Sequence, residues 1–113
     1  MKISDIKEKV ILLKINKTYE EGMSGKDVFH ITRRAWRINT KRKIKAEYAF
    51  GLFNNKIVSI YSITSWHKDK INPKRWEFDG ETASDFMLDK YLNKEIKRFW
   101  KRGQSNPVRY VNC

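Results

Sequence analysis

The order of apolar segments along the 113-residue chain predicts an α+β fold, in which a small, mainly antiparallel β-sheet of about five strands packs with two helices. The sheet is expected to be open or to close partly into a barrel. Two observations favour this class: one segment has apolar residues at helical spacing, and two apolar strand-like segments flank a pair of asparagines. With four Trp, five Tyr and six Phe, the chain can form a small core, so we expect residues 1–113 to be a single domain.

Three short runs of β-branched and aromatic residues predict strands outside the central hairpin. They are residues 10–15 (VILLKI), 75–78 (RWEF) and 108–111 (VRYV). In the second run Trp76 and Phe78 alternate with charged residues, so both are expected to point inward. The following pair, 79–80 (DG), is typical of a turn, and we expect the chain to reverse there.

A β-hairpin is predicted over residues 46–66. Its strands, 46–53 and 57–66, lie on either side of Asn54 and Asn55, and asparagine tolerates the positive φ that a two-residue turn requires. Strict alternation divides the apolar side chains of the second strand between two faces: Ile57, Tyr61 and Ile63 on one, and Val58, Ile60 and Trp66 on the other. Because both faces are apolar, we expect a central hairpin, covered by a helix on one side and by more sheet on the other.

Two helices are predicted, each beginning after a serine that can accept a hydrogen bond from the first turn. Ser24 caps a helix that extends to about residue 38, and Ser84 caps a shorter helix that ends near residue 92. The first helix has one apolar side, which we expect to pack on the core. Its opposite side, expected to face solvent, is basic and carries Lys26, His30, Arg33, Arg34 and Arg37.

The chain is strongly basic, because 25 Lys and Arg oppose 13 Asp and Glu and give a net charge of +12 at pH 7. Such an excess attracts phosphate-bearing polymers, although a lysine-rich surface that merely aids solubility is the alternative. Arginine, whose planar guanidinium suits phosphates and base edges, is concentrated in two stretches, 33–42 and 98–109. This clustering favours nucleic acid as the partner.

The sequence also indicates a location. It contains no apolar run near the roughly 20 residues that cross a bilayer and no signal peptide, so neither a membrane partner nor secretion is expected. Its single cysteine, Cys113, cannot form an internal disulfide and fits a reducing cytoplasm. Oligomeric state and a protein partner stay open.

Catalytic motifs are absent from the sequence. There is no glycine-rich phosphate loop and no nucleophile motif, and His30 and His67 are too few for a histidine-rich metal site. Glu77, Asp79 and Glu81 resemble a nuclease metal site, but three acids around a turn are more often solvated. We therefore predict no catalytic residue, no metal and no cofactor, and we expect His67 to lie in a solvated loop.

Three groups of residues are candidates for contact with nucleic acid. The first helix and the segment after it contribute His30, Arg33, Arg34, Arg37 and Arg42. The C-terminal segment combines arginines with amide and hydroxyl groups that can read base edges, and it contributes Arg102, Gln104, Ser105, Asn106 and Arg109. Trp66 and Trp76, beside polar loops, are candidates for stacking on a base. The structural alternatives are a solvated helix face, an ordinary turn and the core.

Four stretches carry a resemblance to a known family: TRRAWRIN, the AEYAFGLFNNKIVSIYSI hairpin, KRWEFDGETA and YLNKEIKRFWKRGQSNPVRYVN. From about Val10 onward the chain resembles a small prokaryotic domain family that occurs alone or beside nuclease modules of the GIY-YIG type. This chain has no room for a nuclease module, so the resemblance implies no cleavage. The small-barrel topology is also similar to PUA, ASCH and EVE-type domains, which bind RNA or modified bases in a pocket between the barrel and its helices.

These features predict a non-catalytic module that binds RNA or DNA. A basic helix would contact phosphates, and an aromatic pocket near Trp66, Trp76 and residues 103–106 would receive a base, including a modified one. Two alternatives remain open. One is a small phage or mobile-element protein that masks a partner or sequesters a nucleotide, and the other is a metal-dependent nuclease that uses the acids near Glu77.

Overall fold

The computed structural model of the protein describes residues 1–43, 45–97 and 106–113. Within these residues the chain forms five strands: β1 (Val10–Lys14), β2 (Tyr48–Phe53), β3 (Lys56–Lys68), β4 (Trp76–Thr82) and β5 (Val108–Val111). The same residues contain a 3₁₀ turn, η1 (Ile3–Asp5), and three α-helices: α1 (Gly25–Arg33), α2 (Thr40–Lys43) and α3 (Asp85–Tyr91). The α+β prediction is confirmed, with one more short α-helix than expected, because α2 forms beyond the predicted end of the first helix. No helix among the described residues has the length and apolar character that crossing a membrane requires.

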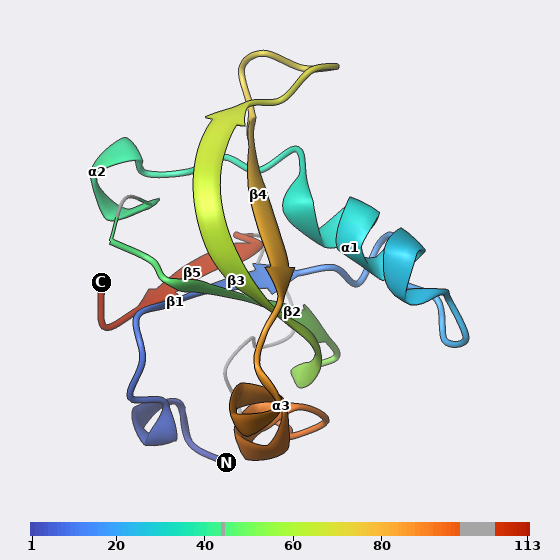
Figure 1. Ribbon diagram of the computed structural model, residues 1–113, viewed down its shortest axis with the longest axis vertical. Helices are drawn as coiled ribbons and strands as arrows, with labels where there is room; N and C mark the ends of the chain where they lie inside the picture. The colour runs from blue at the N-terminus through green and yellow to red at the C-terminus, as the bar shows by residue number, and fades with distance from the viewer. Residues whose placement is uncertain (44, 98–105) are drawn as a thin grey trace.

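The five strands form one open sheet in the order β4-β3-β2-β1-β5. Neighbouring strands are antiparallel except β1 and β2, which are parallel because α1 and α2 lie between them in the chain. The sheet is strongly twisted, so that the long β3–β4 ribbon crosses over β1 and β5 in Figure 1. Of the two predicted forms, an open sheet and a partly closed barrel, the open sheet is the one found.

Helices cover both faces of the sheet, and each face has its own core. Phe50 and Ile60 pack against Tyr91 of α3 on one face. Leu13 and Phe78 belong to the second core, on the face that α1 covers. The expectation that more sheet covers one side of the hairpin is therefore wrong, since the N-terminal turn η1 and α3 occupy that side (Figure 1).

Two bulges in β3 overturn the predicted division of its side chains. Gly51 pairs with Ser59 while Leu52 pairs with Ile57, so one extra β3 residue stands between these pairs. A second irregularity lies between Ile63 and Ser65, opposite β4. Each extra residue reverses the alternation of side chains. As a result Ile57 and Ile60 share the α3-side core, and the other four residues, Val58, Tyr61, Ile63 and Trp66, belong to the α1-side core.

The hairpin turn and the α3 cap are confirmed, but the turn expected at residues 79–80 is wrong. Asn54 and Asn55 have φ angles of 49° and 64°. Strand β4 continues through Gly80, which pairs with Ile63. A side chain at Gly80 would collide with the Ser62 carbonyl oxygen, so this glycine allows close strand approach beside the bulge instead of forming a turn.

Helix α1 begins at the predicted cap, where Ser24 Oγ accepts from the Asp27 N–H (3.2 Å), but it ends at Arg33 and not near residue 38. Ala35 then takes a left-handed conformation with φ of 69°. The next residue, Trp36, exchanges two backbone hydrogen bonds with Trp76 at the start of β4 (3.0 and 2.9 Å). This bridge ends the helix and holds the segment after α1 against the sheet.

Candidate functional site

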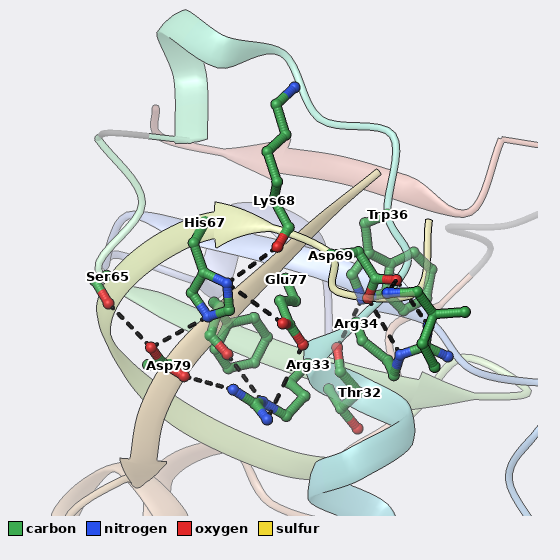
Figure 2. Close-up of polar contacts among 12 residues, drawn as sticks. Thr32, Arg33, Arg34, Trp36, Ser65, His67, Lys68, Asp69, Glu77 and Asp79 are labelled. Carbon is green, nitrogen blue, oxygen red and sulfur yellow. Dashed lines mark hydrogen bonds and ion pairs between the residues drawn. The ribbon is translucent and has the colours of Figure 1, made fainter. Parts of the chain in front are cut away.

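Arg33, predicted to face solvent, is held against β4. Its Nε donates to the Phe78 carbonyl oxygen at 3.1 Å, and its guanidinium is ion-paired with Asp79. Its Nη1 lies 4.0 Å from Glu77, a residue only 4% exposed (Figure 2). The predicted solvent-facing position is wrong because acidic residues of β4 lie opposite this side of the helix.

His67 contacts the same two acids, so that Arg33, His67, Glu77 and Asp79 form one cluster. His67 lies in β3, not in the predicted solvated loop. Its Nδ1 lies 3.3 Å from Glu77 Oε1 and 3.1 Å from the Lys68 carbonyl oxygen, and its Nε2 lies 3.2 Å from Asp79 Oδ2 (Figure 2). Oxygen acceptors therefore lie beside both ring nitrogens of His67. Burial raises the pKa of the Asp79 carboxyl, but His67 and Arg33 outweigh burial and lower it below its ordinary value. Arg33 and His67 are therefore both engaged with acids inside the protein.

Arg34 is also paired internally. Its Nε and Nη2 donate to the two carboxylate oxygens of Asp69 at 3.1 and 2.8 Å, a bidentate arrangement. Asp69 is 2% exposed and also accepts from the backbone N–H groups of Ile71 (3.2 Å) and Asn72 (2.9 Å). Burial raises the pKa of the Asp69 carboxyl, but the Asn72 N–H and the Arg34 guanidinium outweigh burial and lower it. This pair fixes the β3–β4 loop to the end of α1.

Two cavities lie next to the segment that follows α1. The first, of about 450 Å³, is bounded by the end of β1, the loop after it and the end of α1. Its lining is mainly apolar with basic and amide groups: Lys14, Ile15, Asn16, Lys17, Thr18, His30, Ile31, Arg34, Ala35, Trp36 and Pro107. The Trp36 ring is held in place because its Nε1 donates to the Thr32 carbonyl oxygen at 2.7 Å.

The second cavity, of about 380 Å³, is lined by Arg37, Ile38, Asn72, Lys74, Arg75 and Trp76. One continuous segment contributes to both cavities: residues 34–36 line the first, and residues 37–38 line the second. Among the described residues, no acidic side chain lines either cavity. The Lys68 ammonium lies 4.2 Å from the centre of the Trp76 ring.

The remaining predicted residues divide between these cavities and other places. His30, Arg37 and Trp76 line the cavities as candidates for contact. The half-buried Trp66 packs against Phe78 at the α1-side core, with ring centres 5.4 Å apart, and lines neither of these two cavities.

Three predicted C-terminal contacts lie outside the described residues: Arg102, Gln104 and Ser105. Asn106 Oδ1 accepts from the Val108 N–H at 3.1 Å, and Arg109 lies on β5 opposite Leu12. Arg42 lies over the Tyr110 ring, 4.4 Å from its centre, and donates to the Cys113 carbonyl oxygen. Among the described residues, the arginines of the two stretches do not gather around one cavity.

Sequence reasoning missed the cavity residues that come from other segments, chiefly Lys74, Arg75 and Trp36. A signal was present, since Trp36-Arg37 and Arg75-Trp76 each join a tryptophan to an arginine, and the two tryptophans pair across the sheet edge. In contrast, nothing in local sequence places Lys14 and Lys17 beside His30.

Comparison with known proteins gives no match to a family model, to a curated protein or to a solved structure. The resemblance to a prokaryotic family and to PUA-like domains therefore stays a prediction.

Proposed function

We propose that this protein binds nucleic acid without cleaving it, and that phosphates contact the second cavity. The observation that supports the proposal is the basic lining of the two cavities: Lys14, Lys17, Arg37, Lys74 and Arg75 line them, and no described acidic side chain does. A net charge of +12 adds a long-range attraction for a polyanion.

The internal ion pairs support this proposal, because they engage two other arginines of the basic segment within the protein. Arg33 is ion-paired with Asp79 of β4, and Arg34 is ion-paired with Asp69 of the β3–β4 loop. Arg37 and Lys74 are exposed, and both line the second cavity with Arg75. Three cations at one hollow attract successive phosphates more strongly than scattered surface lysines do, because their fields add within a Debye length of about 10 Å.

The first cavity supplies a place for an unstacked base, including a modified one. Its volume lies within the range of small-ligand pockets, and its apolar walls include Ile15, Ile31 and the fixed ring of Trp36. Asn16 and Thr18 carry groups that can hydrogen-bond to a base edge. The strained conformation of Ala35, φ 69°, also lies at this cavity, and such strain concentrates at functional sites. The proposal includes a cytoplasmic location for the protein.

The proposal is tested by removing the three cations of the second cavity together. The triple variant Arg37→Ala, Lys74→Ala, Arg75→Ala is expected to bind fluorescent RNA and DNA oligonucleotides at least about tenfold more weakly at 100 mM salt, measured by anisotropy. The loss should be similar for all sequences, because phosphate contacts carry no sequence information.

A matched control removes the same charge elsewhere. Lys56, Lys94 and Lys97 are exposed. Lys56 and Lys94 lie where the β2–β3 turn bonds to the segment after α3, and Lys97 follows in that segment, far from the β3–β4 loop (Figure 1). Their triple alanine variant should keep most of the affinity. Equal losses in the two triple variants would mean that net charge alone drives binding, and equal affinity of the cavity variant and the wild type would contradict the proposal.

A further inference from the structure

The loop between β3 and β4 presents an isoleucine to solvent. Ile71 is 78% exposed, the highest value for a large apolar residue in the described part of the chain. The loop extends beyond the body of the molecule, at the far end of the β3–β4 ribbon from α3 (Figure 1). An exposed isoleucine at a protruding tip contributes nothing to the core. Single exposed apolar residues are common, so a role in binding a partner is argued from the bonds and charges of the loop that carries this one.

Hydrogen bonds hold the backbone of the loop although its tip is exposed. Asp69 accepts from the N–H groups of Ile71 and Asn72, and its carboxylate also accepts two hydrogen bonds from the Arg34 guanidinium. The Asp69 N–H donates to the Arg75 carbonyl oxygen, and the Arg75 N–H donates to that of Asn72, both at 2.9 Å. Such bonds lower the entropic cost of binding, because they hold the backbone of the loop in the free protein.

Basic residues flank the isoleucine along the chain. Lys70, Lys74 and Arg75 belong to the loop, and Lys68 ends the strand that leads into it. The loop's one acid, Asp69, is buried and paired, so the outer surface of the loop is cationic. An apolar tip on a loop with exposed cations is complementary to a nucleic-acid duplex, in which phosphates flank stacked apolar bases.

We propose that Ile71 inserts between adjacent base pairs of a duplex while the loop cations hold the flanking phosphates. This inference rests on the proposed function and names the form of nucleic acid that the site recognises. Asn72, Lys74 and Arg75 of the loop also line the second cavity. A nucleic-acid strand that extends from the inserted Ile71, the wedge, along this cavity would therefore reach Arg37. Apolar side chains that enter a base step unstack it and kink the duplex, most easily at flexible pyrimidine–purine steps.

The experiment uses a 20-base-pair duplex that carries 2-aminopurine, a base whose fluorescence rises when it is unstacked, at a central TA step. Wild-type protein is expected to raise the fluorescence. Ile71→Ala should abolish the rise and weaken duplex binding about tenfold, with an unchanged salt dependence, because apolar contact is lost and phosphate contacts stay. Phe86→Ala is the matched control, since Phe86 is 71% exposed on α3, at the other end of the molecule (Figure 1).

The outcomes separate the wedge from nucleic-acid binding itself. If Ile71→Ala binds the duplex as tightly as wild type, or wild type gives no fluorescence change on binding, the wedge is wrong while the proposed function stands. If wild type binds no oligonucleotide at all, both are wrong. Vesicles of phosphatidylserine and phosphatidylcholine form a parallel arm, and Ile71-dependent binding to vesicles without binding to duplex would assign the loop to a lipid surface and overturn the proposal.

Discussion

Asp69→Ala is expected to lower the free energy of unfolding by about 3 kcal/mol, measured by urea denaturation. The substitution leaves the half-buried Arg34 guanidinium without its bidentate partner. It also leaves the N–H groups of Ile71 and Asn72 without their acceptor. Removing one member of a buried ion pair costs more than the pair contributes, because the remaining charge stays desolvated. A loss below about 1 kcal/mol would show that the pair does not hold the loop.

Asp69→Asn provides the matched comparison and a pH test. The asparagine oxygen can still accept from the backbone, but the charge is gone. In the wild type the folded pKa of Asp69 lies below its ordinary value of 3.8, so the unfolded chain binds the proton more readily. The stabilisation is therefore present above the ordinary pKa and is lost as pH falls through the folded one. Between about pH 5 and pH 2, Asp69→Asn should lose stability less steeply than wild type; identical profiles would contradict this.

Arg33→Ala is expected to lower the free energy of unfolding by about 2 kcal/mol and to leave nucleic-acid affinity within about twofold. The buried Glu77 and the partly exposed Asp79 then keep only their contacts with His67 in the cluster. The loss is smaller than for Asp69 because Asp79 is partly exposed to water, which replaces some of the lost contact.

Arg37→Ala should give the opposite result: unchanged stability and weaker binding to every oligonucleotide. Arg37 is exposed and lines the second cavity, four residues beyond Arg33 in the same basic segment. Thermal denaturation and anisotropy on the two variants give a direct comparison. If Arg33→Ala weakened binding as much as Arg37→Ala without a loss of stability, the assignment of Arg33 to the internal cluster would be wrong.

Local sequence signals predicted the elements that local interactions determine. The asparagine pair, the serine caps at Ser24 and Ser84 and the apolar runs of β1 and β5 each act within a few residues. The bulges in β3 and the end of α1 depend on tertiary contacts with β2 and β4, which no local pattern contains. A single extra residue in a strand moves the side chains that follow it to the opposite face of the sheet.

The same limit explains the mistaken prediction for the basic side of α1. Within the helix that side contains almost no acid, but Asp69 and Asp79 reach it from 35 and 46 residues along the chain. Arginines of one stretch therefore divide into structural members, Arg33 and Arg34, and a solvent-facing member, Arg37. Charge clustering in sequence locates a basic region, whereas the acids that the fold brings to it decide which cations stay available.

The most direct test of the central claim, that the cations at the second cavity contact phosphates, is the slope of log affinity against log salt between 50 and 200 mM. Each phosphate contact contributes about 0.7–0.9 to this slope. Wild type is expected to give a steep slope, and the variant lacking Arg37, Lys74 and Arg75 a slope shallower by about two to three. The same slope for both proteins, or a flat response in the wild type, would contradict the account.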